Sequence, residues 1–459
     1  MKKLTAIILC GIMLFSFYGC GEKNNITPDN TENTSQNTNN ETDTEIYFLN
    51  FKPEVSKVYE EIAAEYKKET GVTVKVVTAA SDTYEQTLTS EVAKKDAPTI
   101  FQINGPVGYN KWKNYCLDLS NTKLFSYLSD KNLAITKGNE VYGIPYVVEA
   151  YGIIYNRDIM DRYFKLTDRQ TKINSIEEIN NFEKLKTVVE DMTKHKDTLE
   201  IEGVFASTSF SGGNHWRWNT HLTNIPLYYE FAENEDYEDA TSAGLDAEEI
   251  TFKYSDNFKN IFDLYTNNSG TEKGLLGSKS IADSMAEFAL GKVAMVQNGT
   301  WAYKEISDVK GNVVSEDDIG FLPIYTGVKG EENQGLCIGT ENYIAINSKV
   351  SKEKQEASIE FLEWLFSSEK GKNFVTKELK FISPFTTFGD DDMPDDPLSR
   401  EAIRWMNKEN TRSLPWIFVS YPSEVFKEDV SAALLEYVQG QTDWDTVKER
   451  ITTSWKNER

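Results

Sequence analysis

Residues 45–77 have the sequence EIYFLNFKPEVSKVYEEIAAEYKKETGVTVKVV, and this stretch decides the fold class of the chain. The apolar run Ile46–Leu49 predicts a buried strand. Apolar side chains then recur at helical spacing across residues 55–66, and Gly71 ends the helix. The β-branched run Val72–Val77 predicts a second strand. A strand, a helix and a strand in this order favour two parallel strands joined by a crossover helix.

The same alternation continues along the chain. A helical pattern covers about 84–95, and Ile100–Ile103 again predicts a strand. Further helical patterns lie near 176–194, 256–266, 280–290, 353–377 and 444–455. We therefore predict an α/β protein with a mostly parallel sheet and its ligand face at the carboxyl ends of the strands. The folded part has about 415 residues, which is too many for one core, so two domains or lobes are expected.

The N-terminus carries an export signal. Two lysines precede an apolar run over residues 4–18, which is too short to span a bilayer. The run ends at Gly19-Cys20, and the following stretch, rich in Asn, Thr and Glu, should stay disordered. The segment resembles a bacterial lipoprotein signal. The resemblance implies that residues 1–19 are removed, that Cys20 is acylated, for example with palmitate, and that residues 20–44 are a tether to the outer face of the cell membrane.

The alternative for the N-terminus is an ordinary secretory signal with an incidental cysteine. In both cases the chain works outside the cytoplasm. Beyond Cys20 only Cys116 and Cys337 remain in the folded part. Their spacing leaves open whether they pair, although two buried free thiols are the simpler interpretation.

Charge limits the partners of the folded part. The formal net charge is −24 and comes from dispersed Asp and Glu. Such a surface repels phosphate, so nucleic acid is not an expected partner, and it also repels anionic lipid and acidic polysaccharide. A neutral ligand fits better. Aromatic residues make up 12% of the chain and supply many flat apolar faces.

Four segments carry a resemblance to a known family. They are Val55–Gly71, Tyr142–Asp158 (YGIPYVVEAYGIIYNRD), Phe288–Ala302 (FALGKVAMVQNGTWA) and Ala357–Gly371. In this order and spacing, behind a lipoprotein-like signal, they resemble the extracellular solute-binding proteins of sugar ABC importers, the family of maltose-binding protein. The match covers nearly the whole folded part.

The resemblance implies a two-lobed periplasmic-binding-protein-like fold with a hinge and a ligand cleft between the lobes. By similarity, lobe one holds residues 45–148 and 343–386, and lobe two holds 149–342 and 387–459. The family binds a solute and delivers it to membrane permease subunits without chemistry, so we expect a monomer with no cofactor and no catalytic residues. The expected ligand is a neutral oligosaccharide.

A sugar site needs flat aromatic surfaces and polar side chains at the ring edges. The resemblance places a stacking aromatic at Trp301, after the Asn298-Gly299 turn, and a sugar-binding carboxylate at Glu149, close to Tyr151. The alternatives are a core tryptophan and a hinge salt bridge. It also places an aromatic near Trp416.

Other candidates follow from position in the chain. Trp216 and Trp218 lie in a Gly-rich segment after a strand, and in an extended segment one would face the ligand and the other the core. Three further candidates follow predicted strands, at the edge where ligands bind: Asn50, Phe51 and Asn104.

Competing functions are a secreted carbohydrate-active enzyme, such as a glycoside hydrolase, and a binder of a non-sugar solute. A hydrolase would also need aromatics and paired carboxylates, which are too numerous here to select from sequence. His215 and His221 are weak metal candidates because they lack cysteine support. The acidic run over residues 390–396 lacks the glycine and final glutamate of an EF-hand, so a solvated loop is favoured over a calcium site.

Overall fold

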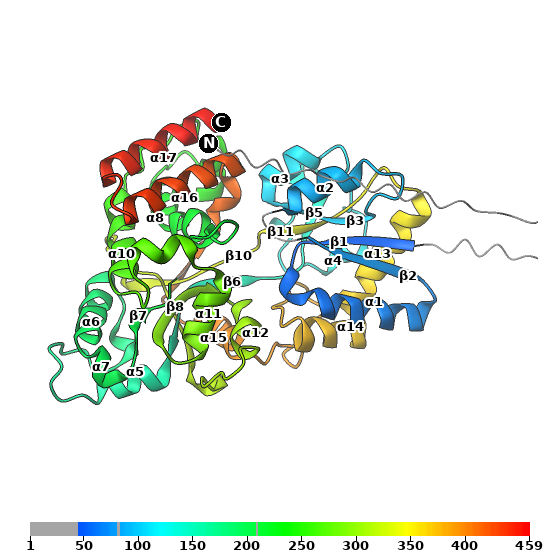
Figure 1. The fold of residues 1–459 in the computed structure, drawn as a ribbon. Helices are drawn as coiled ribbons and strands as arrows, with labels where there is room; N and C mark the ends of the chain where they lie inside the picture. Colours follow the sequence, from blue (N-terminus) through cyan, green and yellow to red (C-terminus); the bar gives the residue numbers. More distant parts are fainter. Residues whose placement is uncertain (1–44, 80–82, 208–209) are drawn as a thin grey trace, which may run out of the picture. The chain divides into compact units, whose positions relative to one another are not determined.

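The computed structural model describes residues 45–79, 83–207 and 210–459. The predicted signal, the lipidated Cys20 and the tether lie outside the described residues. Two sheets, each flanked by helices, organise the described chain (Figure 1). The α/β class predicted from the sequence is confirmed.

The first sheet has the strand order β2-β1-β3-β11-β5-β4. Its strands are β1 Glu45–Asn50, β2 Thr73–Thr78, β3 Ile100–Asn104, β4 Ile135–Lys137, β5 Glu140–Pro145 and β11 Asn342–Ile346. The helices associated with it are α1 Ser56–Thr70, α2 Tyr84–Val92, α3 Gly105–Trp112, α4 Lys123–Tyr127, α13 Lys352–Ser367 and α14 Glu369–Asn373. Strand β1 pairs in parallel with both β2 and β3, which confirms the predicted strand–helix–strand unit.

Side chains alternate along β1 and build a core on each face of this sheet. Ile46 and Phe48 belong to the cluster that contains the apolar faces of α1 and α13. Tyr47 and Leu49 belong to the cluster on the α2 and α3 side. Helix α1 ends where the sequence predicts, because Gly71 takes a left-handed conformation and its N–H donates to the carbonyl of Lys67 at 2.8 Å.

The second sheet has the order β12-β10-β6-β8-β7, and β9 also pairs with β6. Its strands are β6 Glu149–Asn156, β7 Gly203–Phe205, β8 Val293–Gly299, β9 Ile319–Leu322, β10 Gln334–Gly339 and β12 Arg412–Pro415. The α-helices of this part are α5 Arg157–Phe164, α6 Phe182–Lys194, α7 Lys196–Leu199, α8 Thr223–Phe231, α9 Ala240–Asp246, α10 Ser255–Asn267, α11 Ile281–Ala289, α12 Ala302–Ser307, α15 Pro397–Met406, α16 Glu424–Val438 and α17 Trp444–Glu458.

The expectation of a mostly parallel sheet is wrong for both sheets. In the first sheet only the β1–β2 and β1–β3 pairs are parallel, whereas β11 runs antiparallel to β3 and β5, and β4 runs antiparallel to β5. The second sheet departs further from the expectation. Strand β6 runs antiparallel to β8, β9 and β10, and only the β7–β8 and β10–β12 pairs are parallel. The reason is that β6 enters this sheet directly from the first one, so no crossover helix sets its direction. All eight residues of β6 are buried, which makes it the central strand of this part.

The chain passes between the two sheets at three places. Strand β5 ends at Pro145 and β6 begins at Glu149, while β10 ends at Gly339 and β11 begins at Asn342. The third passage lies between η8 (Phe374–Glu378), which packs with α1 and α13, and α15, which packs on β9. Several passages of this kind, two of them short, are typical of a hinge. Among the described helices, none has the length and apolar character that crossing a bilayer requires.

Candidate ligand-binding site

Aromatic rings gather around His221, at the ends of strands in the second sheet. The imidazole stacks on Tyr151 with the ring centroids 4.2 Å apart and meets Trp216 edge-on at 4.8 Å. Three more rings lie around it at 5.3–5.9 Å: Trp301, Trp416 and Phe418. We call these six residues the ring cluster. Four of the candidates predicted from sequence, Tyr151, Trp216, Trp301 and Trp416, therefore lie in one place.

Two glycines explain why tryptophans lie at these strand ends. A Cβ atom on Gly299, at the end of β8, would lie 2.1 Å from the ring of Trp301. A Cβ atom on Gly339, at the end of β10, would lie 2.6 Å from the ring of Trp416. Each indole therefore packs directly on the strand backbone, in space that the side chain of any larger residue at the glycine position would occupy. This gives a structural reason for the Asn298-Gly299-Thr300-Trp301 segment that the sequence singles out.

The segment that carries Trp216 and His221 is helical. A π-helix covers Arg217–Leu222, and it leads into α8. Trp216 precedes it and is half-buried, whereas Trp218 is only 1% exposed and stacks on Phe210 at 5.1 Å. The two tryptophans thus face different surroundings, although the segment is not extended. The position of Trp218 in the core favours packing over ligand contact.

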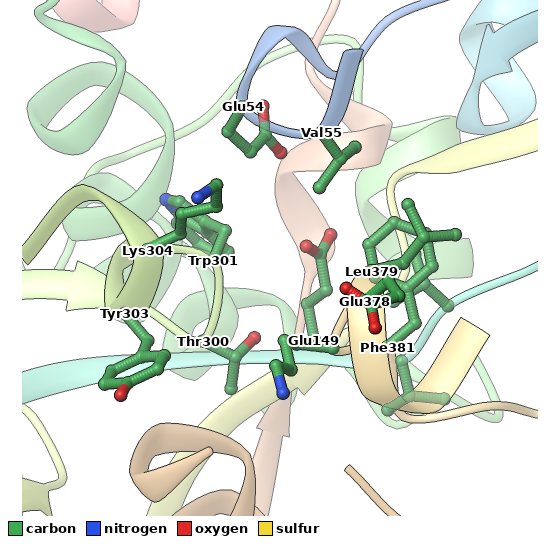
Figure 2. A pocket seen from close by; sticks show the side chains of 13 residues that line it. Glu54, Val55, Glu149, Thr300, Trp301, Tyr303, Lys304, Glu378, Leu379 and Phe381 are labelled. Carbon is green, nitrogen blue, oxygen red and sulfur yellow. The ribbon is translucent and has the colours of Figure 1, made fainter. Parts of the chain in front are cut away.

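Polar side chains line a pocket beside the ring cluster (Figure 2). Trp301 and Lys304 lie on one side of it, Leu379 and Phe381 on the other, and the carboxylates of Glu54 and Glu149 point into the space between. The pocket combines residues that follow β1 with residues of the second sheet. A half-buried indole next to the buried carboxylate of Glu149 and the partly exposed carboxylate of Glu54 suits a ligand with an apolar ring face and hydroxyl edges.

Glu149 is 5% exposed and pairs with Lys52, Nζ to Oε1 at 2.7 Å. Glu54 lies 3.7 Å from the same ammonium group. Burial opposes the charge of Lys52, but Glu149 and Glu54 outweigh burial and raise its pKa. Burial raises the pKa of Glu54, and the charge of Lys52 opposes that rise. Glu149 therefore forms a salt bridge, as in the alternative interpretation, and its role as a ligand carboxylate stays a prediction.

The candidates of the first sheet lie at its carboxyl edge, where topology predicts them. The buried Asn50 amide donates to the carbonyl of Lys52 at 2.8 Å and to Thr78 Oγ1 at 3.1 Å, so it fixes the turn that presents Lys52. Phe51 is half-buried and packs edge-on against Tyr84. Asn104 donates to Glu341 Oε1 at 3.0 Å. Asn50 thus makes internal contacts, whereas Phe51 and Asn104 stay partly accessible.

The part of the chain that forms the first sheet contacts the part that forms the second sheet at the N-terminus of α3. The N–H of Gly105 donates to the carbonyl of Glu341 at 3.1 Å. Gly105 has φ +60°, and a Cβ atom there would lie 2.8 Å from Cβ of Val419. Val419 belongs to η9 (Ile417–Ser420), which follows the Trp416 of the ring cluster. This contact joins the first sheet to the segment that carries two of the aromatic rings.

Sequence reasoning missed the central role of His221, which it weighed only as a metal ligand. Burial, together with the charges of Arg217 and Lys427, lowers the pKa of His221 well below its usual value, so the ring is neutral. Within the described residues no group of three metal-binding side chains forms. The acidic run near residue 392 is held by lysines, with Asp392 on Lys372 at 2.6 Å and Asp395 on Lys380 at 2.7 Å.

Comparison with known proteins assigns the chain to a family. The model of the bacterial extracellular solute-binding protein family matches residues 61–401. The chain belongs to this family, which is a family of binding proteins that act outside the cytoplasm. No curated protein matches the chain by sequence.

Solved structures share the fold at low sequence identity. A chitin oligosaccharide binding protein superposes with a TM-score of 0.69 at 16% identity, covering 90% of this chain and 98% of that one. The solute-binding protein RafE in complex with raffinose superposes with a TM-score of 0.68 at 19% identity, covering 90% and 99%. Maltose-bound MalE3 of T. maritima superposes with a TM-score of 0.65 at 13% identity, covering 90% and 99%. These likenesses show the two-lobed periplasmic-binding-protein-like fold of this chain.

Proposed function

We propose that this protein is the substrate receptor of an ABC importer and captures a neutral oligosaccharide between its lobes. The observation that carries the proposal is the ring cluster beside the pocket of Glu54 and Glu149. Indole faces stack on the apolar face of a sugar ring, and carboxylates accept hydrogen bonds from hydroxyls. Three structural neighbours are a chitin oligosaccharide binding protein, a complex with raffinose and a maltose-bound protein, which supports a sugar as the ligand.

The site residues follow from this proposal. Trp301 and Trp216 supply the stacking faces, and Trp416 and Tyr151 support them from within the ring cluster. Glu149 accepts hydrogen bonds from the sugar while it is held by Lys52. Phe51 and Asn104 complete the site from the first sheet. We also propose lobe boundaries of 45–148 with 343–386 and 149–342 with 387–459, and the three passages between the sheets support them.

A calorimetric titration tests the function. The purified protein is titrated with maltotriose, raffinose, chitotriose and xylotriose, and each mixture is then analysed for cleaved sugar. We expect one of these sugars to bind with a dissociation constant in the micromolar range or below, with no cleavage, and small-angle scattering to show compaction. Binding of none of them would contradict the proposal, and catalytic cleavage would favour the glycoside hydrolase alternative.

The proposed anchor is a separate claim. Acylated Cys20 would be residue one of the mature protein, on a tether at the outer face of the cell membrane. Mass spectrometry of the native N-terminus should find a lipid on this cysteine, and Cys20→Ala should release the protein to the medium or leave it unprocessed. An unmodified N-terminus at another residue would contradict the anchor without affecting the binding site.

A further inference from the structure

Arg217 is a buried cation beside Trp216 of the ring cluster. Its exposed fraction is 0%, and its guanidinium carbon lies 4.1 Å from the ring centroid of Trp216. Its Nε, Nη1 and Nη2 atoms find no acceptor within hydrogen-bond distance in the described part of the chain. A guanidinium carries five N–H donors, and a buried charge without acceptors costs stability. Trp216 covers one face of the group but accepts none of these hydrogen bonds.

Glu305 lies on α12, four residues after Trp301, and its charge interacts with that of Arg217. No nitrogen of the Arg217 guanidinium hydrogen-bonds to Glu305 in the described part of the chain. Glu305 Oε2 is buried and receives no hydrogen bond from the described chain. Arg217, which can only donate, and Glu305 Oε2, which can only accept, therefore both lack a hydrogen-bond partner in the described chain, while the Glu305 carboxylate also interacts with Asn298.

Gln297 adds a second unused acceptor next to Arg217. Its Nε2 donates to the backbone carbonyl of Arg217 at 2.9 Å, while its Oε1 is buried and unpaired among the described residues. The surroundings of Arg217 therefore hold three N–H bearing nitrogens that need acceptors and two oxygens that need donors. Buried polar groups of native proteins are nearly always hydrogen-bonded, so this set indicates a ligand.

We propose that Arg217 and Glu305 together recognise hydroxyl groups of a neutral sugar and make the receptor reject a sugar acid at this position. The proposal rests on the proposed function and specifies its ligand class. A hydroxyl satisfies both residues, because its oxygen accepts from Arg217 while its hydrogen is donated to Glu305. A carboxylate can only accept. It would pair with Arg217 but leave Glu305 and Gln297 without donors.

Charges around the pair also oppose a sugar acid. The carboxylate of Glu54 interacts with that of Glu305, and Glu149 lies in the same pocket. Lys52 is already paired with Glu149 and Glu54. An anionic ligand would therefore meet more negative than free positive charge at short range. Arg217 alone would suggest an anion site. Because the carboxylate of Glu305 lies near it, the expected ligand is a polyol instead.

The test compares Arg217→Met and Glu305→Gln with the wild-type protein. Arg162→Met is the matched control, since Arg162 pairs with Asp158 on the surface of α5, away from the ring cluster. Each protein is titrated with maltotriose, raffinose, chitotriose and xylotriose, and with trigalacturonate as the sugar acid. Thermal melting of the free proteins is measured in parallel.

We expect the wild-type protein to bind a neutral trisaccharide and not trigalacturonate. Arg217→Met and Glu305→Gln should each weaken that binding about ten- to a hundredfold, and the losses should not add in the double variant. The free Arg217→Met protein should melt at a higher temperature than wild type, because the substitution removes an unpaired buried charge. Arg162→Met should bind normally.

Four outcomes would overturn the proposal. Tight binding of trigalacturonate by the wild-type protein would make Arg217 an anion site. Unchanged binding of the neutral sugar by both variants would make the pair structural, and the proposed function would stand. A lower melting temperature of Arg217→Met with unchanged affinity of Glu305→Gln would assign Arg217 to folding alone. Binding of no sugar by the wild-type protein would remove the proposed function and this inference together.

Discussion

Trp301 packs within the ring cluster and, in the proposed function, also stacks on the ligand. Its half-buried indole contacts Trp216, His221 and Trp416, and Gly299 leaves room for the ring over the end of β8. Part of the ring is committed to the ring cluster, and part borders the pocket.

We expect Trp301→Ala to weaken sugar binding about thirty- to a hundredfold, since a stacked indole contributes roughly 2–3 kcal/mol. Calorimetric titration and thermal melting together check this prediction. The control is Trp364→Ala, because Trp364 packs on Tyr66 and donates to Glu69, far from the ring cluster. Trp364→Ala should lower the melting temperature and leave affinity unchanged. A large fall in melting temperature for Trp301→Ala, with unchanged affinity, would make Trp301 a core residue.

The ion pair of Lys52 and Glu149 gives a second prediction at this scale. Each side chain is 7% exposed, so removal of one partner leaves a buried charge. We expect Glu149→Gln to lower the free energy of unfolding by about 3–5 kcal/mol, as measured by urea denaturation. Glu61→Gln, which breaks an exposed pair with Lys57, should leave it unchanged. Equal effects of the two substitutions would show that Glu54 alone can neutralise Lys52.

A helix or strand is predicted well from the sequence when the pattern that specifies it lies within a short stretch of the chain. The bounds of β1, α1 and β2 follow from periodicity and from Gly71, all within thirty or so residues. The π-helix Arg217–Leu222 was not predicted, because a Gly-rich and aromatic segment has no clear period. Its geometry depends on hydroxyl contacts of Thr220 and Thr223 with earlier carbonyls.

The residues of the candidate site also divide into those that local sequence motifs predict and those that such motifs miss. Local motifs identified Trp301, Trp216, Trp416 and Tyr151, which the structure brings together. They gave no indication of His221 and Arg217 as members of the same group, because the burial of a polar side chain depends on distant segments. Glu305 was missed for another reason: its neighbours on α12 are ordinary helix residues, and only Arg217 makes its position unusual.

The contact between α3 and η9 yields a prediction about closure. We expect Gly105→Ala to weaken ligand binding about tenfold, because the new Cβ would meet Val419 and the left-handed backbone at this position suits glycine. Small-angle scattering with and without the bound sugar should show less compaction than in the wild type. Gly108→Ala, whose Cβ would make an ordinary 3.4 Å contact, is the control. Normal compaction of Gly105→Ala would mean that the two elements separate in the ligand-bound state.

At the scale of the whole molecule, buried carboxylates make stability depend on pH. Burial raises the pKa of several acidic groups above the usual value: Glu54, Glu305, Glu331 and Glu341. A carboxyl group whose pKa is higher in the folded state binds its proton more tightly there, so the free energy of unfolding rises as pH falls toward the unfolded pKa. The net charge of −24 also shrinks on acidification, which reduces repulsion.

We therefore expect the melting temperature to be higher at about pH 5.5 than at about pH 7.5. Below about pH 4 it should fall, because ion-paired carboxylates with lowered pKa, such as Asp392 and Asp395, then lose their charge. Melting curves across this range check the prediction, and Glu341→Gln should reduce the acid gain. A steady rise in melting temperature from pH 5.5 to pH 7.5 would contradict it.

The ring cluster has a consequence for the lifetime of the protein outside the cell. Its members come from segments between Tyr151 and Phe418, so the cluster is complete only when nearly the whole second sheet has formed. We expect contacts that close such long loops to form late in folding, because the loop entropy must be lost first. Contacts absent from the transition state slow unfolding without speeding refolding. A sugar bound there would lengthen the time that the chain resists proteases. Receptor turnover would then follow nutrient supply, with loaded molecules persisting and empty ones degraded first.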